Sequence, residues 1–223
     1  MKNSANSGSR LEASYRERYA KVLKPLEEPL LGHIKQYFNG QPRIDRISVR
    51  AKEIVSFMEK SNNRENGKLK YVDPLGQIQD QIGARIITFY RSDVEALDTM
   101  VQRYFTAIEL KDRVPDSEWE FSYFGRHYVL VLPSDVIIDN FDKSMVPHFF
   151  ELQIKTLFQH AWSEAGHDLG YKPGQQPLTA DQKRLLAFSS AQAWGADHVF
   201  EQLFQERHAP AKTLFTPSII PPK

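Results

Sequence analysis

Three long polar side chains occupy every second position in HFFELQIKT, residues 148–156. Side chains of a strand point alternately to its two faces, so Glu151, Gln153 and Lys155 share one face. A carboxylate in such a row could bind a metal ion or act as a general base. A strand with one solvent-facing side would show the same pattern, so the pattern by itself does not establish a site.

The residues that follow this strand have helical spacing, with His160, Glu164, His167 and Tyr171 at steps of four, three and four. Steps of this size place side chains on one face of a helix. Two histidines and a glutamate are potential zinc ligands, but their spacing matches no zinc signature, and a polar helix face explains it more simply.

A cluster of cations lies in VRAKEIVSFMEK, residues 49–60. Arg50, Lys52 and Lys60 are positively charged, and Ser56 lies between the two lysines. At a junction between a strand and a helix these side chains could converge on a polyphosphate, where arginine gives bidentate contacts and lysine a point charge. A solvated basic helix is the alternative interpretation.

Two further clusters lie at predicted strand ends. In QDQIGAR, Asp80 precedes a strand and Arg85 lies within it. A carboxylate there suits Mg²⁺, which prefers oxygen ligands, and an ordinary Asp–Arg ion pair is the alternative. In FSYFGRHY, Tyr123 and Phe124 are planar rings and His127 begins a strand. Aromatic rings at a loop edge can stack on a base, although half-buried aromatics are common.

The four clusters together supply cations for phosphates, two carboxylates for a metal and an aromatic ring for a base. The sequence contains neither the G-x-x-x-x-G-K-[ST] loop nor the G-x-G-x-x-G fingerprint of common nucleotide-binding proteins. The combination therefore favours phosphoryl-type transfer, in which positioning and charge neutralisation supply most of the catalysis.

Helices and strands that alternate along the chain must position these clusters. Periodicity predicts strands at 43–50, 84–90, 127–133 and 148–156, and helices at 11–38, 52–60, 74–82, 92–105, 157–170 and 180–206. Ser92 and Thr179 are suitable N-caps, and Pro25 and Pro29 should break or bend the first helix. The segment SNNRENGK has the composition of a loop. Interleaved helices and strands indicate a single α/β layer structure.

Length and composition narrow the class of protein. The 223 residues are 41% hydrophobic and 26% charged, and the 29 Lys and Arg nearly balance the 28 Asp and Glu, which gives a net charge of +1. Such a chain has no overall charge that would attract nucleic acid. The absence of cysteine excludes disulfides and thiolate metal sites. With neither a signal peptide nor a membrane-spanning apolar run, we expect a cytoplasmic protein that does not enter a membrane.

Taken in order, the clusters resemble the synthetase domain of the RelA/SpoT family, whose members transfer pyrophosphate from ATP to the ribose 3′-hydroxyl of GDP or GTP. The family patterns are found in this sequence as Arg50, Lys52, Ser56 and Lys60 for R-x-K-x₃-S-x₃-K; Asp80 and Arg85 for the Asp–Arg pattern; Glu151, Gln153 and Lys155 for E-x-Q-[IV]-[RK]-T; and His167, Tyr171 and Lys172 for H-x₃-Y-K. The resemblance covers about residues 43–172.

The resemblance implies a role for each matching residue. It implies an ATP site made of Arg50, Lys52, Ser56, Lys60 and Arg85; a catalytic centre made of Glu151, Gln153 and Asp80, in which Asp80 and Glu151 hold Mg²⁺; and an acceptor site made of Tyr123, His127, Lys155, His167, Tyr171 and Lys172. The implied fold is a mixed β-sheet flanked by helices, α/β or α+β, of nucleotidyltransferase type. The implied protein is a small stand-alone synthetase of the alarmones ppGpp and pppGpp.

The loop before His127 departs from the family pattern. The family usually has G-Y-x-S-x-H after Pro-Lys, whereas this chain has SYFGRH, with Ser122 in place of Gly and Gly125 in place of Ser. The preceding segment, 113–121, contains three carboxylates that would repel a nucleotide phosphate if they faced it. Alternative acceptors are therefore adenine nucleotides or the 3′ end of tRNA, as in toxin members of the family. A catalytically silent nucleotide-binding module is the third possibility.

The sequence also predicts how the chain is organised. We expect residues 1–10 to be disordered, residues 11–207 to form one synthetase domain with flanking helices at 11–38 and 180–206, and residues 208–223 to form a proline-rich tail. The last helix and the tail could pack against a second copy of the chain or a regulatory protein. A helix buried in its own domain is an equally good interpretation.

Overall fold

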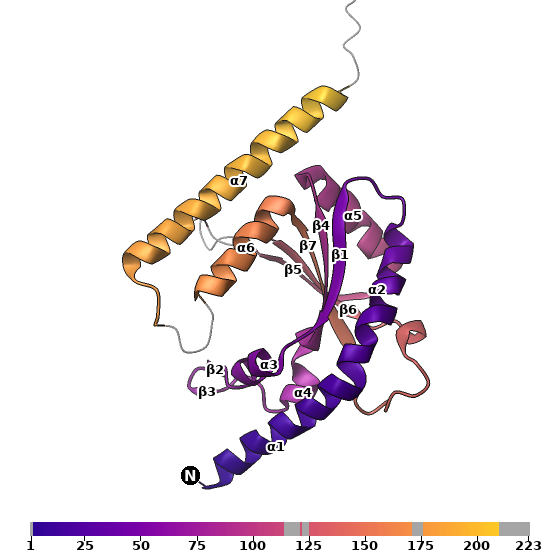
Figure 1. Cartoon of the computed structure of the whole chain (residues 1–223), viewed down its shortest axis with the longest axis vertical. Coiled ribbons are helices and arrows are strands. Elements are labelled where there is room, and N and C mark those ends of the chain that lie inside the picture. Colours follow the sequence, from indigo (N-terminus) through magenta and orange to yellow (C-terminus); the bar gives the residue numbers. More distant parts are fainter. Residues whose placement is uncertain (1, 114–120, 122–124, 171–175, 210–223) are drawn as a thin grey trace, which may run out of the picture.

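A five-stranded mixed sheet lies at the centre of the protein, which a computed structural model describes over residues 2–113, 121, 125–170 and 176–209 (Figure 1). Its strands are β1 (Ile44–Ala51), β4 (Ile82–Thr88), β5 (Ala107–Arg113), β6 (Gly125–Val131) and β7 (Phe149–Thr156), in the spatial order β1-β4-β7-β6-β5. β4 and β7 pair in parallel, and the other neighbours are antiparallel. The expected mixed sheet flanked by helices is confirmed.

Helices surround this sheet. They are α1 (Lys2–Arg18), α2 (Lys24–Phe38), α3 (Ile54–Ser61), α4 (Pro74–Gln77), α5 (Arg91–Tyr104), α6 (Leu157–Gly170) and α7 (Ala180–His208). A π-helical stretch, Tyr19–Leu23, joins α1 to α2, and short 3₁₀ turns lie at Gln79–Gln81 and Ser134–Val136. A small hairpin of β2 (Arg64–Glu65) and β3 (Lys68–Leu69) follows α3. Both residues of its turn, Asn66 and Gly67, have positive φ, as the tightest hairpin turns require.

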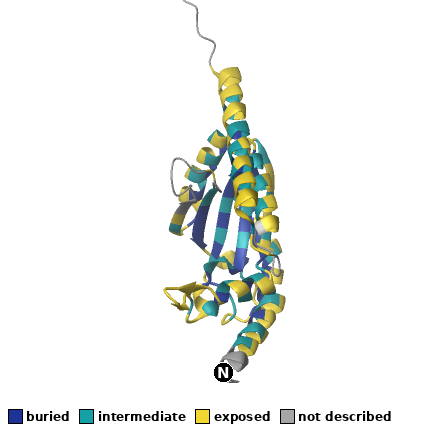
Figure 2. Ribbon diagram, turned by 90° about the vertical axis from the view of Figure 1, so that its left-hand side faces the viewer, coloured by how far each residue is buried: buried dark blue, intermediate teal, exposed yellow. Residues whose placement is uncertain are grey.

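The two faces of the sheet differ in polarity because side chains alternate along each strand. Phe150, Leu152 and Ile154 of β7 are fully buried on one face, together with Ile82 and Ile86 of β4. These residues and the apolar side of α2 belong to one hydrophobic core. Figure 2 shows the strands as the most buried part of the chain and the outward sides of the helices as exposed. The polar residues of β7 are thereby left for the opposite face.

The N-terminal part of the chain differs from its prediction. We expected residues 1–10 to be disordered, but α1 begins at Lys2. The reason is that an existing helix extends at the gain of one hydrogen bond per residue, and this stretch contains no proline to stop it. Pro25 lies in the first turn of α2, where proline is tolerated, and Pro29 lies inside α2. The irregular part of this helical region is the π-helical stretch Tyr19–Leu23, which precedes both prolines.

Helix starts and one strand also differ from expectation. Ser92 is not the N-cap of α5: Tyr90 precedes the helix, and Asp93 accepts a hydrogen bond from its N–H. Strand β5 was not predicted, because its sequence AIELKDR is mostly polar and it forms an edge of the sheet. The Thr179 cap is confirmed, since its side chain accepts the N–H of Gln182 and the Gln182 side chain accepts that of Thr179.

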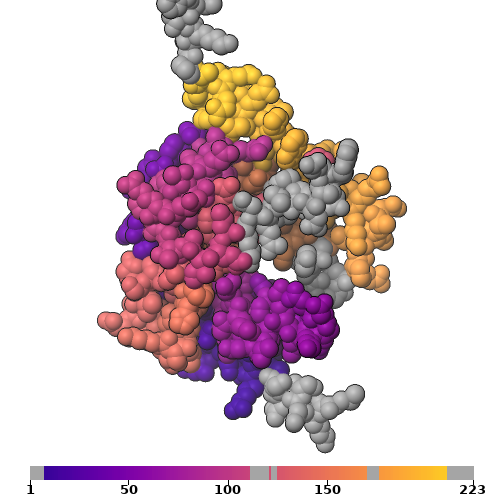
Figure 3. Space-filling view, turned by 180° about the vertical axis from the view of Figure 1, so that it is seen from behind, coloured from indigo at the N-terminus to yellow at the C-terminus, as the bar shows by residue number. Residues whose placement is uncertain are grey.

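α7 lies along the outside of the molecule. It packs against α6, where Trp162 Nε1 donates hydrogen bonds to Leu186 O and Ser189 Oγ. In the space-filling view from behind, the first residues of α7 form the right-hand edge and its last residues the top (Figure 3). Among the described residues, no helix is long and apolar enough to cross a membrane.

Candidate active site

A cleft of about 710 Å³ opens on the polar face of the sheet. Its walls come from β1, α3, β4, β6, β7, α6 and the start of α7. The residues that line it are Ser48, Arg50, Ala51, Lys52, Glu53, Ser56, Asp80, Gly83, Ala84, Arg85, His127, Glu151, Gln153, Lys155, Trp162, Ser163, Glu164, Gly166, His167 and Leu186.

Strand register aligns polar residues across the floor of this cleft. Ser48 of β1 lies opposite Arg85 of β4, Arg85 lies beside Gln153 of β7, and Gln153 lies opposite His127 of β6. Neighbouring strands lie about 4.8 Å apart, so this row crosses the floor in about 15 Å. The row joins segments that are far apart in the sequence.

A second row of residues across β1, β4 and β7 leaves space beside the carboxylate of Glu151. Arg50 lies opposite Gly83, and Gly83 lies beside Glu151. The space above Gly83 is open: a Cβ added there would meet only Glu151 O, at 3.9 Å. A glycine at this position therefore leaves room for a bound group between the Arg50 and Glu151 side chains.

Glu151 is held by two hydrogen-bond donors. His127 Nδ1 lies 2.7 Å from Glu151 Oε1, and Gln153 Nε2 donates to Glu151 Oε2 at 2.8 Å. Burial by itself would raise the pKa of Glu151, but the hydrogen bonds of His127 and Gln153 and the charges of His127 and Lys60 lower it to about 2. The carboxylate is therefore ionised at neutral pH and fixed in orientation.

Asp80 lies between two lysines at another edge of the cleft. Lys52 Nζ is 3.0 Å and Lys60 Nζ 2.7 Å from the same oxygen, Asp80 Oδ2. The other oxygen, Oδ1, is buried and has no hydrogen-bond partner among the described residues. Lys60 does not line the cleft itself but reaches it through Asp80.

The acidic side chains suit a hard metal ion only in part. Among the described residues, no group of three or more His, Cys, Asp or Glu side chains could hold a metal. Asp80 and Glu151 are two carboxylates lining one cleft, and Asp80 Oδ1 has spare acceptor capacity. Mg²⁺ is commonly held by one or two carboxylates with substrate phosphates and waters, so this donor set fits such an ion once a nucleotide is bound.

The α6 wall makes charged contacts with the floor. Arg85 Nη1 is 2.8 Å from Glu164 Oε1 and 3.4 Å from His160 Nδ1. Lys155 is buried, and its Nζ lies 3.3 Å from Ser163 Oγ. Burial and the charge of Arg85 lower the pKa of Lys155 to about 7. Lys155 and Arg85 are thus two basic side chains in one part of the cleft, where they could bind an anion.

Most residues selected from the sequence meet in this cleft. The lining includes Arg50, Lys52, Ser56, Asp80, Arg85, His127, Glu151, Gln153, Lys155 and His167. Tyr123, Tyr171 and Lys172 lie outside the described residues, as does the acidic segment 114–120. Sequence reasoning did not select five of the lining residues as site residues: Ser48, Gly83, Trp162, Ser163 and Leu186. Of these, Ser48 could have been found, because it lies two residues before Arg50 and so shares its strand face.

The chain is similar to proteins of known activity. A family model described as the region found in RelA / SpoT proteins matches residues 49–176. The GTP pyrophosphokinase YjbM of Bacillus subtilis strain 168 is 25% identical over 158 residues, which are 69% of this chain and 70% of that protein.

Solved structures share the fold. Small alarmone synthetase 1 from Bacillus subtilis, bound to its product pppGpp, superposes with a TM-score of 0.64 at 21% identity, covering 91% of this chain and 98% of that one. Its complex with AMPCPP gives a TM-score of 0.58 at 22% identity, covering 85% and 93%. Because the family model spans more than half of the sequence, this chain belongs to the RelA/SpoT family.

Proposed function

We propose that the protein is a GTP diphosphokinase: it transfers the β,γ-pyrophosphate of ATP to the ribose 3′-hydroxyl of GDP or GTP, making ppGpp or pppGpp. The observation that supports this most is the cleft in which the phosphate-binding cations and the ionised Glu151 lie on adjoining strands and helices. The relatives with the same fold are named for this reaction or were solved with pppGpp or AMPCPP, an analogue of ATP.

The donor nucleotide would occupy the side of the cleft made by β1, α3 and β4. Arg50, Lys52 and Lys60 would neutralise the triphosphate, and the Ser56 hydroxyl would donate a hydrogen bond to it. Lys52 and Lys60 now contact Asp80, so both cations are already gathered at one point. Arg85 would complete the ATP site from the floor, where Glu164 fixes its direction.

In the reaction, the acceptor 3′-oxygen forms a bond to the β-phosphorus of ATP while the bond from that phosphorus to the α,β-bridging oxygen breaks. AMP leaves with the bridging oxygen, and the proton of the 3′-hydroxyl is released. Asp80 and Glu151 would hold Mg²⁺, which neutralises charge on the phosphates when it is bound. A carboxylate with a pKa of about 2 is a weak base, so we assign Glu151 to orienting the 3′-hydroxyl and binding the ion.

The acceptor would lie toward β6, β7 and α6. His127, Lys155 and His167 line this part of the cleft and can contact its phosphates. We keep Tyr123, Tyr171 and Lys172 as proposed acceptor contacts on the basis of the family motifs. A cytoplasmic location remains a prediction from composition.

One incubation tests the reaction. Purified protein is given Mg²⁺ and ATP labelled at its terminal phosphate, with GDP, GTP, ADP, ATP or total tRNA offered separately. We expect label in products of GDP and GTP, with one AMP released per labelled product. Label found only in tRNA or in adenine nucleotides would identify a toxin-type transferase instead. If ATP binds and no acceptor becomes labelled, the protein is a silent nucleotide-binding module.

A further inference from the structure

Two carboxylates about one helical turn apart on α7, Asp197 and Glu201, accept hydrogen bonds from residues outside that helix. Asp197, only 3% exposed, accepts a hydrogen bond from the Thr156 hydroxyl at 2.7 Å. Glu201 Oε2 accepts from the backbone N–H of Ser92 at 2.9 Å and from its hydroxyl at 3.1 Å. We call Asp197 and Glu201 the carboxylate clamp.

Both contacts lie where a parallel strand turns into a helix. Thr156 is the last residue of β7, directly before α6, and Ser92 is the second residue of α5, shortly after β4. β4 and β7 are neighbours in the sheet and carry Arg85 and Glu151 into the cleft. The carboxylate clamp therefore binds the two strand-to-helix junctions that follow β4 and β7.

Thr156 also organises the first turn of α6. Its hydroxyl oxygen accepts the N–H of Gln159 at 3.1 Å, while its own N–H donates to Gln159 Oε1 at 3.0 Å. This helix supplies Ser163 beside Lys155 and Glu164 beside Arg85. Because α6 is a stiff element, the position of its first turn sets where these partners lie.

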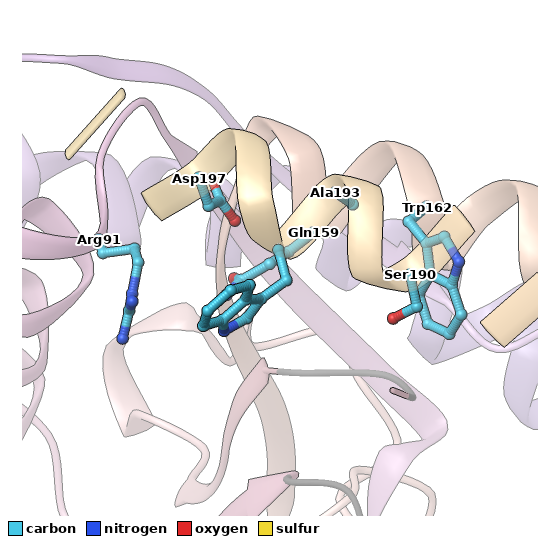
Figure 4. A pocket seen from close by; sticks show the side chains of 7 residues that line it. Arg91, Gln159, Trp162, Ser190, Ala193 and Asp197 are labelled. Carbon is cyan, nitrogen blue, oxygen red and sulfur yellow. The ribbon is translucent and has the colours of Figure 1, made fainter. Parts of the chain in front are cut away.

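Burying a carboxylate costs free energy, so Asp197 is a poor residue for simply filling space. Burial raises the pKa of Asp197 to about 6, and Asp197 Oδ1 has no hydrogen-bond partner among the described residues. A pocket of about 80 Å³ adjoins it, and Figure 4 shows Arg91, Gln159 and Asp197 around this pocket, from α5, α6 and α7. An apolar residue of similar size would pack there with less loss of hydration.

We propose that Asp197 is a positioning residue: through Thr156 it fixes the first turn of α6, and thereby the contacts of Ser163 and Glu164 with the cleft floor. Its catalytic consequence rests on the proposed pyrophosphate transfer, whereas its effect on α6 does not. The structure thus gives α7, which contributes only Leu186 to the cleft lining, a role in the geometry of the site.

The test compares full-length variants in which the hydrogen bond is lost or kept. Asp197→Ala and Thr156→Val remove it, and Asp197→Asn and Thr156→Ser keep an acceptor or a hydroxyl. Glu206→Ala is the matched control, because Glu206 is an exposed carboxylate of the same helix that, among the described residues, accepts a hydrogen bond from Gln202 alone. Hydrogen exchange of residues 157–169 reports on α6, and steady-state transfer reports kcat and KM separately.

We expect Asp197→Ala and Thr156→Val to speed exchange in α6 at least about tenfold and to lower kcat by about 10- to 100-fold, since small misplacements of catalytic groups have such effects. Both should leave the fold intact, and Asp197→Asn and Thr156→Ser should recover most of kcat. Unchanged exchange in α6 with Thr156→Val, or lower stability with unchanged kcat, overturns the proposal. If Asp197→Ala does not fold, Asp197→Leu, which removes the acceptor but fills the space, decides. If the unaltered protein transfers nothing, the proposed reaction is wrong. Hydrogen exchange in α6 then tests the positioning role of Asp197 by itself.

Discussion

At the scale of single residues, the Glu151 side chain is fixed from two sides, because His127 and Gln153 each contact one of its oxygens. Replacing Glu151 with Gln keeps the size of the side chain and removes its charge. We expect kcat to fall by more than about tenfold, or ~1.4 kcal/mol in the barrier, with affinity for AMPCPP little changed.

Single-turnover rates and calorimetry with AMPCPP measure these two quantities for Glu151→Gln. Glu59→Gln serves as the control, since Glu59 is an exposed carboxylate on α3 outside the cleft lining. A rate that stays within about tenfold of the unaltered protein would show that the charge of Glu151 is not needed for transfer.

We expect Lys155 to give the reaction a pH dependence near neutrality. Its pKa is lowered to about 7 by burial and Arg85, so the ammonium is charged at pH 6 and mostly neutral at pH 9. A cation attracts the acceptor phosphates, so kcat/KM for the acceptor should fall as pH rises through about 7. Lys155→Arg stays charged, and its profile from pH 6 to 9 should be flatter. Identical profiles in both proteins would remove Lys155 from acceptor binding.

The sequence was informative about which residues share a face but not about which faces meet. Alternation along one strand placed Glu151, Gln153 and Lys155 together, and the structure confirms it. It could not reveal that Arg85 lies beside Gln153, because strand register depends on the packing of segments about 70 residues apart. The roles of these residues remain predictions.

At the scale of elements, strongly periodic segments were predicted well. Residues 157–170 and the Thr179 cap agree with α6 and α7, because apolar spacing and capping chemistry are local. β5 was missed because its membership in the sheet comes from pairing with β6. Ile108 and Leu110 of β5 are half exposed, so burial left little trace in its sequence.

The cap of α7 offers a direct stability test. Thr179→Ala removes the acceptor for the Gln182 N–H, and we expect a loss of about 1 kcal/mol in the free energy of unfolding. Gln182→Ala removes only the reciprocal bond to the Thr179 N–H and should cost less. Denaturant unfolding measures both, and equal stability of Thr179→Ala and the unaltered chain would contradict the capping role.

At the scale of the whole molecule, α7 presents apolar side chains to solvent. Leu185, Phe188, Val199 and Leu203 are at least half exposed and recur at helical steps, with the polar Gln192 between them. A long apolar row of this kind favours association, so we expect the purified protein to self-associate with increasing concentration. Light scattering that gives 25.8 kDa at every concentration would exclude it.

A variant pair locates this association. Phe188→Asp places a charge in the apolar row and should shift the mass toward the monomer, whereas Gln202→Asp, at an exposed polar position of the same helix, should not. Equal masses for both variants would place the contact elsewhere on the chain.

That residues 11–207 form one domain remains our proposal.

The two lysines on Asp80 have a consequence for how the protein responds to ionic strength. If ATP with Mg²⁺ binds as proposed, Lys52 and Lys60 exchange a carboxylate oxygen for phosphate oxygens, so ion pairs are traded rather than created. Added salt then weakens the starting and the final pairs alike. We expect the affinity for AMPCPP to depend only weakly on sodium chloride, and Asp80→Asn, which frees both cations beforehand, to make that dependence steeper. Calorimetry between about 50 and 300 mM salt compares the two slopes, and parallel slopes would mean that the lysines keep their carboxylate when the nucleotide arrives.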